Sequence, residues 1–162
     1  EDSKGYVTFP LTFGAGIGIK KGEKLLVAAD FAVQNWSSYR AFNQTQGLRN
    51  SMRVSLGMQY VPNYKANGKG NYYKRVHYRA GIRYSQTYLE LKSTQLTEVA
   101  ATFGVGFPVG RNYILQNFSM VNVGVEYGQR GTVDNGLIKE DFIKVRVGFT
   151  INDRWFVKPK YD

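Results

Sequence analysis

Residues 76–88, VHYRAGIRYSQTY, alternate between apolar and polar positions. Val76, Tyr78 and Ile82 share one parity, whereas Arg79 and Arg83 lie on the other. A period of two residues indicates a β-strand with one apolar and one polar face. A register shift by one residue would move both arginines onto the apolar face, at about 2–4 kcal/mol each if that face meets lipid. The pattern therefore fixes the orientation of this strand.

Six further segments show the same alternation, so the sequence predicts seven long antiparallel strands in one domain that covers residues 1–162. The predicted strands cover residues 9–19, 25–33, 52–60, 76–88, 99–107, 121–127 and 143–151. Polar or glycine-containing segments separate them, and we expect Pro108 to end the fifth strand. Residues 154–161 are too short and too basic to assign from the pattern.

The alternation alone does not say what the apolar face meets, because a soluble β-sandwich or lipocalin-like barrel segregates its residues in the same way. The length of the segments favours lipid, since alternation over about 9–11 residues matches a tilted transmembrane strand better than a soluble one. Glycines on the polar parity also favour lipid, because a concave lumen needs small residues whereas glycine weakens a solvent-facing strand. These glycines are Gly14, Gly16, Gly18, Gly57, Gly81, Gly104, Gly106, Gly124, Gly128 and Gly148.

Aromatic residues near the strand ends are the third feature that favours a membrane. They resemble the interfacial girdles of outer-membrane barrels. The candidate girdle residues are Trp36, Tyr60, Tyr84, Phe107, Tyr127, Phe149 and Trp155. No segment has the roughly 18–20 apolar residues of a membrane-spanning helix. We therefore predict an all-β protein, an antiparallel transmembrane β-barrel located in the bacterial outer membrane.

The formal net charge of +10 raises the question of a nucleic-acid partner. The basic residues are spread over loops and single strand positions without a basic helix, so we expect no nucleic-acid binding. The chain has no cysteine and a single histidine, His77, which argues against a metal site, and no cofactor is expected. A catalytic pair of His77 with Ser55 or Ser85 is conceivable. We expect His77 to be a hydrogen-bonded lumen residue instead, in a protein that is not an enzyme.

Charged residues on the polar parity are the candidate site residues. Five basic residues face three acidic ones there: Asp30, Arg53, Arg79, Arg83, Glu98, Glu126, Lys144 and Arg146. A cationic lumen wall would suit the carboxylate of a hydrophobic ligand, because arginine binds carboxylates through two hydrogen bonds. Alternatively, these charges pair with one another and stiffen the barrel, and for any single residue we favour this interpretation.

Seven is an odd number of strands, whereas single-chain bacterial barrels have an even number. Two solutions remain open. Residues 154–161 supply a shorter eighth strand that closes a small barrel, or the chain is the C-terminal part of a larger barrel.

Several segments resemble the C-terminal half of the FadL-type outer-membrane proteins of Bacteroidetes. These are DFAVQNWS at residues 30–37, YKRVHYRAG at 73–81, VEYGQRGT at 125–132 and NDRWF at 152–156. The resemblance extends over nearly the whole chain, from about Tyr6. It implies that the seven strands are the last seven of a fourteen-stranded barrel with an N-terminal hatch. The hatch and the first strands have no counterpart in this sequence, so no ligand-binding residue is carried over.

The resemblance implies uptake of long-chain fatty acids or other hydrophobic small molecules, with outer-membrane lipid and lipopolysaccharide as surroundings. Two other functions remain open. One is a closed eight-stranded outer-membrane barrel with a structural or surface-recognition role and a packed interior. The other is a soluble lipid-binding β-barrel.

Overall fold

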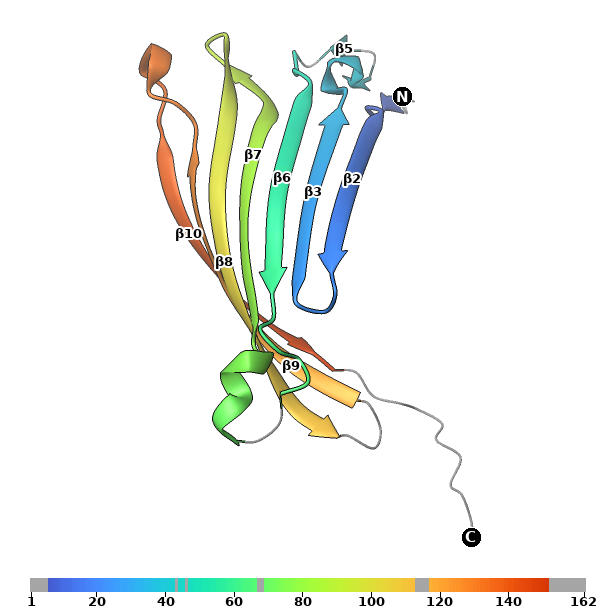
Figure 1. The fold of residues 1–162 in the computed structure, drawn as a ribbon. Coiled ribbons are helices and arrows are strands. Elements are labelled where there is room, and N and C mark those ends of the chain that lie inside the picture. The colour runs from blue at the N-terminus through green and yellow to red at the C-terminus, as the bar shows by residue number, and fades with distance from the viewer. Residues whose placement is uncertain (1–5, 43, 46, 67–68, 113–116, 152–162) are drawn as a thin grey trace, which may run out of the picture.

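The computed structural model describes residues 6–42, 44–45, 47–66, 69–112 and 117–151. One curved antiparallel sheet of seven strands dominates this part of the chain (Figure 1). Its strands are β2 (Thr12–Lys21), β3 (Leu25–Gln34), β6 (Ser51–Tyr60), β7 (His77–Leu91), β8 (Thr94–Asn112), β9 (Asn117–Arg130) and β10 (Glu140–Thr150). Each strand pairs with its neighbours in chain order, from β2 at one edge to β10 at the other. The predicted all-β, antiparallel class with seven long strands is confirmed.

Short elements lie at the two ends of the sheet (Figure 1). The upper end carries the minor strands β1 (Val7–Thr8), β4 (Arg40–Ala41) and β5 (Gln44–Thr45), with the 3₁₀ turns η1 (Trp36–Ser38) and η3 (Asp134–Gly136). The lower end carries the turn between β2 and β3 and the longer 3₁₀ segment η2 (Lys69–Arg75). Across the described ranges, no helix is both long and apolar enough to cross a membrane.

The prediction that Pro108 ends its strand is wrong. The strand β8 continues to Asn112, and Pro108 lies opposite Met120 in the ladder with β9. Proline lacks only the backbone N–H, so a strand tolerates it wherever no ladder donor is needed. The carbonyl of Pro108 keeps a partner, since it accepts a hydrogen bond of 3.0 Å from Tyr72 Oη.

A two-residue turn at Lys92 and Ser93 joins β7 to β8, with Leu91 opposite Thr94. Both turn residues have positive φ, 48° and 62°. This is the backbone of a type I′ turn, whose twist matches that of the flanking strands. The tight hairpin allows β7 and β8 to extend well past their neighbours at the upper end.

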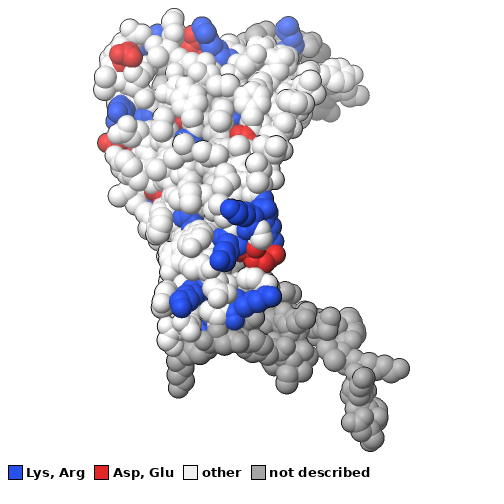
Figure 2. Space-filling view, viewed as in Figure 1, with Lys and Arg blue, Asp and Glu red and all other residues white. Residues whose placement is uncertain are grey.

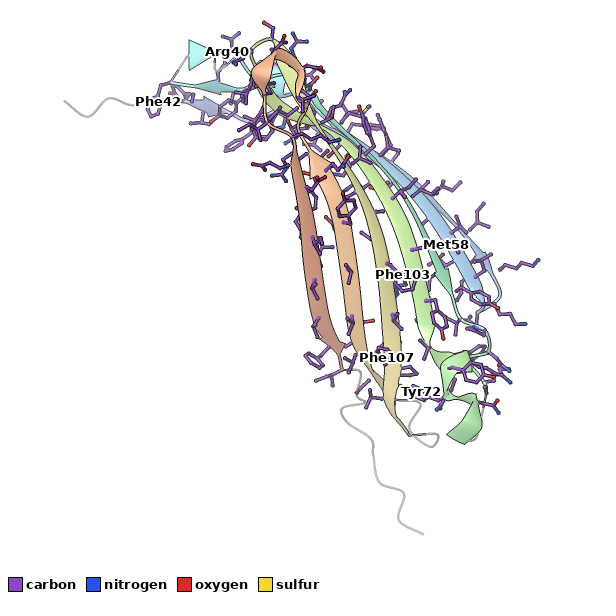
Figure 3. All side chains as sticks on the ribbon, turned by 90° about the vertical axis from the view of Figure 1, so that its left-hand side faces the viewer. Arg40, Phe42, Met58, Tyr72, Phe103 and Phe107 are labelled. Carbon is purple, nitrogen blue, oxygen red and sulfur yellow. The ribbon has the colours of Figure 1, made fainter. Side chains whose placement is uncertain are left out.

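The apolar parity of the sheet is its exposed face. Ile82, Phe103 and Val145 are 59%, 58% and 65% exposed, whereas Glu98 and Glu126 on the opposite face are 6% and 3% exposed. Figure 3 shows the side chains of Met58 on β6 and of Phe103 on β8 along this sheet. The hydrophobic residues that are buried within the described ranges are few: Val61, Ala66, Val76, Ala100 and Met120. Among the described residues, the sheet therefore buries few of its large apolar side chains.

The sheet is open, and within the described ranges β2 and β10 are free edges rather than the two sides of a closed seam. Six antiparallel pairings separate the two edges, so β2 and β10 run in the same direction (Figure 1). Direct pairing between them would be parallel, unlike the antiparallel ladders of outer-membrane barrels. An antiparallel closure thus takes an odd number of further strands. The segment 154–161, considered as one possible eighth strand, lies outside the described residues, as does Trp155.

Candidate functional site

The polar parity of the sheet faces a hollow of about 900 Å³ on the concave side. Its lining includes one glycine of the polar parity from each of five strands: Gly57, Gly81, Gly104, Gly124 and Gly148. At Gly81 a Cβ atom would lie 2.9 Å from Thr102 Oγ1 and 3.2 Å from the carbonyl oxygen of Leu56. Such a contact is too close, so this position needs glycine for packing reasons. The other polar-parity positions supply charged and amide side chains.

A cluster of ion pairs crosses four neighbouring strands beside this hollow. Arg83 on β7 joins two carboxylates, donating hydrogen bonds of 2.6 Å to Glu98 Oε1 on β8 and 3.0 Å to Glu126 Oε1 on β9. The register explains why these side chains meet, because Arg83 lies opposite Ala100 and Glu98 is two residues before Ala100 in β8. Residues that are 15 and 43 positions apart in the chain thereby share one guanidinium group.

Further cations complete the shell around both carboxylates. Arg130 Nη2 lies 2.6 Å from Glu98 Oε2, whereas Arg146 Nη1 lies 2.9 Å from Glu126 Oε2. Lys144 Nζ is 3.3 Å from Glu126 Oε1. We call Arg83, Glu98, Glu126, Arg130, Lys144 and Arg146 the charge cluster. Four cations around two carboxylates leave it with an excess of positive charge.

Burial is unequal within the charge cluster. The side chains of Glu98 and Glu126 are only 7% and 4% exposed, whereas those of Lys144 and Arg146 are 44% and 65% exposed. A buried carboxylate is tolerated when it is paired and hydrogen-bonded, and removal of its partners is costly. The exposed cations contribute less, because water screens them. The strongest coupling in the cluster is therefore that of Arg83 to the two carboxylates.

Two members of this site were missed by the sequence analysis. Arg130 lies on the polar parity of β9, three residues beyond the predicted end of that strand. Phe142 lies on the polar parity of β10 opposite Gly128, and a Cβ atom at Gly128 would clash with its ring. Lys144 Nζ lies 4.2 Å from the centroid of that ring, in cation–π range. Extending the alternation past both ends of each predicted strand would have found both positions.

Arg79 lies apart from the charge cluster, on the wall of the hollow. Its Nε donates a hydrogen bond of 2.8 Å to Gln59 Oε1, and its Nη1 donates one of 2.7 Å to Asn122 Oδ1. Both partners are neutral, and no carboxylate within the described ranges forms an ion pair with Arg79. Its charge is oriented by amides but not neutralised.

The eight predicted charged residues thus divide into two groups. Arg83, Glu98, Glu126, Lys144 and Arg146 join one network, as the mutual-pairing interpretation expects. The other three, Asp30, Arg53 and Arg79, make no ion pair within the part of the chain that the structure describes, and Asp30 and Arg53 are exposed. Asp30 lies opposite Ser55, and Arg53 lies opposite Ser85.

The conceivable catalytic pair is not assembled. His77 and Ser85 lie on one strand eight residues apart, or about 26 Å at 3.3 Å per residue. Ser55 lies opposite Arg83, which is also far along the strand from His77. His77 Nδ1 is buried and has no hydrogen-bond partner in the described ranges, contrary to the expected hydrogen-bonded state. No group of three His, Cys, Asp or Glu side chains gathers among the described residues as a metal site requires.

The predicted girdle aromatics lie at two levels of the apolar face. Phe107 and Phe149 share one row of the sheet through Val121, at the lower end. Tyr60 lies opposite Tyr78 at the same end, two residues higher. Six residues above Tyr78 along β7 comes Tyr84. Tyr127 on β9 lies opposite Ile143 and Ala101 toward the upper end, and the ring of Trp36 in η1 lies 4.6 Å from that of Tyr88.

The apolar face forms an oblique band. The row of Ile19 on β2 reaches Val145 on β10 through the ladder registers. Beyond Val145, the alternating apolar residues continue to Ile151, which lies six residues further along the chain, just after the end of β10. The upper limit of the band shifts in the same direction. It is Phe13 on β2 and Ile143 on β10, and Ile143 lies four residues below the row of Phe13. Spread over six strand spacings of about 4.8 Å, these shifts correspond to a strand tilt of roughly 25–35° from the normal to the band.

Comparison with known proteins gave one match. A family model described as BamG matches residues 1–162. No curated protein and no solved structure matches the chain. The matching family has a different name from the FadL-type family, so the match does not bear on that resemblance.

Proposed function

Because this chain belongs to the BamG family, whose model matches it from residue 1 to residue 162, we propose that it forms part of the wall of an outer-membrane β-barrel. The family name points to the assembly of outer-membrane proteins, and we assign the chain a structural role in that process. It acts without catalysis, by presenting a rigid, lipid-facing wall to its partners.

The distribution of residues between the two faces carries this proposal. An apolar face extends over seven strands and is largely exposed, while two carboxylates are buried on the opposite face. Soluble monomers rarely expose an apolar patch of more than a few hundred Å². Transmembrane barrels have this arrangement, with apolar residues toward lipid and polar residues toward the interior.

The oblique band supports the same conclusion. Strands of transmembrane barrels tilt by about 35–45°, so a flat lipid layer meets each successive strand at a shifted position. The upper value of the strand tilt derived from the oblique band, about 35°, reaches the lower limit of that range. From Ile143 to Ile151 the strand rises about 26 Å, which at this tilt spans about 22 Å, close to the roughly 25 Å apolar band of such barrels.

The free edges support a wall that further strands complete. In a hydrocarbon environment, the unpaired backbone groups of β2 and β10 need partners. Two copies of this chain with the same membrane orientation cannot seal each other, because β2 and β10 run in the same direction and every such seam would be parallel. Completion therefore uses an odd number of additional strands, whether one strand for an eight-stranded barrel or seven for a fourteen-stranded one.

Two measurements on the native organism's full-length protein test this role. Depletion of the protein should lower the amounts of folded outer-membrane barrel proteins, while the amounts of their transcripts stay unchanged. Purification of the tagged protein in mild detergent should recover components of the barrel-assembly machinery. Normal levels of folded barrels after depletion, together with purification of the protein alone, would contradict the assembly role.

A second candidate function is the uptake of long-chain fatty acids or other hydrophobic molecules. The observation that favours it is Arg79, which faces the hollow with neutral partners only. A ligand carboxylate would be a suitable partner for such a guanidinium group. Uptake of a labelled fatty acid by cells should then fall on Arg79→Gln substitution but not on Arg53→Gln. Unchanged uptake in cells that lack the protein would exclude this function.

A further inference from the structure

We propose that the lower end of the sheet binds the phosphate headgroups of anionic glycerophospholipids. This inference rests on the membrane location proposed above, and it adds a specific lipid partner. The binding surface, here called the basic ledge, consists of residues 20–24 between β2 and β3, residues 61–66, and residues 72–75 at the end of η2.

Backbone hydrogen bonds join the three segments of the basic ledge. The N–H of Val61 donates to the carbonyl oxygen of Lys24 at 2.8 Å, and that of Asn63 donates to Lys74 at 2.7 Å. Val61, Ala66 and Val76 are 2%, 7% and 4% exposed, and these are most of the buried hydrophobic residues in the described ranges. Buried hydrophobic residues therefore lie in the ledge and next to it, and its segments are joined by backbone hydrogen bonds.

The basic ledge is fixed against the lower ends of β7 and β8. Tyr72 Oη donates a hydrogen bond of 3.0 Å to Pro108 O, and Tyr78 Oη donates one of 3.2 Å to Tyr73 O. Figure 3 shows Tyr72 near Phe107 at this end of the sheet. Phe107 belongs to the lowest aromatic row of the apolar face, so the ledge lies where that face ends.

Positive charge gathers on this surface. Figure 2 shows Lys and Arg side chains concentrated at the lower end of the molecule. The basic ledge carries six cations and one carboxylate: Lys20, Lys21, Lys24, Lys65, Lys74 and Arg75 against Glu23. Glu23 is paired with Lys20 at 2.8 Å, which leaves five cations without a carboxylate partner in the described ranges.

Three tyrosines lie under these cations. Lys65 Nζ lies 5.6 Å from the ring centroid of the adjacent Tyr64, and Lys74 Nζ lies 5.8 Å from that of the adjacent Tyr73. Arg75 Cζ lies 5.3 Å from the ring centroid of Tyr72. The three rings are 42%, 57% and 38% exposed, respectively. Tyrosine prefers the headgroup level of a bilayer, and a basic residue beside it attracts anionic headgroups. Arg75 Nε is also buried without a hydrogen-bond partner in the described ranges.

The upper end lacks this charge excess. Its acidic residues nearly balance its basic ones: five acidic residues, Glu90, Glu98, Asp134, Glu140 and Asp141, stand against six basic ones, Arg40, Arg49, Arg53, Lys92, Arg130 and Lys139. One pair is direct, since Arg49 Nε donates a hydrogen bond of 2.7 Å to Glu90 Oε2. The sheet is thus polarised, and an anionic headgroup layer is attracted to one end of the apolar band only. This asymmetry indicates phospholipid phosphates at the lower end.

The test compares lipid selectivity of the full-length protein in bilayers. The protein is reconstituted in phosphatidylcholine vesicles that contain spin-labelled phosphatidylglycerol or spin-labelled phosphatidylcholine, and the motionally restricted lipid fraction is measured. We expect phosphatidylglycerol to be preferred and high salt to reduce the preference. The double substitution Lys65→Gln with Lys74→Gln should reduce it by up to about fivefold per lysine. The matched control, Lys92→Gln with Lys139→Gln, removes the same charge from the upper end and should change it little.

Equal reduction by both double variants would overturn the proposal, because net charge alone would then explain the preference. No preference in the unmodified protein, or a preference for lipopolysaccharide without one for phosphatidylglycerol, would also overturn it. A restricted lipid fraction without headgroup selectivity would still show insertion. Failure of the basic ledge is thus distinguishable from failure of the membrane proposal, in which no restricted lipid is seen.

Discussion

Glu126 provides the most direct test of the charge cluster. Its side chain is 4% exposed and lies within 3.3 Å of basic atoms from Arg83, Lys144 and Arg146. The Glu126→Gln substitution keeps the shape and removes the charge. The bond to the mostly buried Arg83 is worth about 1.5–3 kcal/mol as a charge-assisted hydrogen bond. The two more exposed cations add at most about 1 kcal/mol each. We expect a loss of about 3 kcal/mol in the free energy of unfolding.

The assay is urea unfolding of the full-length protein in phospholipid vesicles, followed by tryptophan fluorescence. Asp30→Asn is the matched control, because Asp30 is an exposed carboxylate of the same face and has no ion pair in the described ranges. Its effect should stay within about 0.5 kcal/mol. A loss below about 1 kcal/mol for Glu126→Gln would refute the reasoning, since the buried carboxylate would then contribute no more than a surface charge.

Three further predictions concern packing and the apolar face, and the same unfolding assay measures each. Gly81→Val should destabilise the sheet by about 1–3 kcal/mol, because the valine side chain would overlap neighbouring strands. Gly57→Ala should change the stability little, because an added Cβ there has only one atom within 4 Å, at 3.9 Å. Equal effects of the two substitutions would contradict the packing argument. Phe142→Ala should cost about 1–2 kcal/mol, less than a fully buried phenylalanine, because the ring covers Gly128 on a half-exposed surface; no measurable loss would show that the ring does not pack there. Phe103→Arg should cost about 2–4 kcal/mol in bilayers if this side chain faces lipid, and a neutral result would place it in water.

The strands were predictable because their alternation is nearly free of exceptions. In β10, for example, Ile143 to Ile151 keep one parity while Lys144 and Arg146 keep the other. Once the parity of a strand is known, it shows on which face each charged residue lies and which residues belong to the concave wall. What parity cannot give is the register between strands. The contact of Arg83 with Glu126 depends on two hairpins that bring together residues 43 positions apart.

The misses have related physical causes. Phe142 precedes the first apolar residue of its predicted strand and Arg130 follows the last one of its own, where the apolar pattern ends but the backbone ladder continues. Pro108 resembles a terminator, yet β8 extends past it. The odd count of strands left two solutions open, an eighth strand or a larger barrel, and the described strands form a sheet that is not closed, with two parallel-running edges. The pattern within a strand specifies its faces and carries no information on how many strands complete the ring.

The central claim is that the apolar face meets lipid while the charge cluster faces water. Single tryptophans at Phe103→Trp and Phe142→Trp, in a Trp36→Phe and Trp155→Phe background, report on the two faces in vesicles with brominated acyl chains. We predict strong quenching by the brominated lipid at position 103, and at position 142 quenching by aqueous acrylamide but little by the lipid. Acrylamide quenching at both positions without lipid quenching at either would contradict the account.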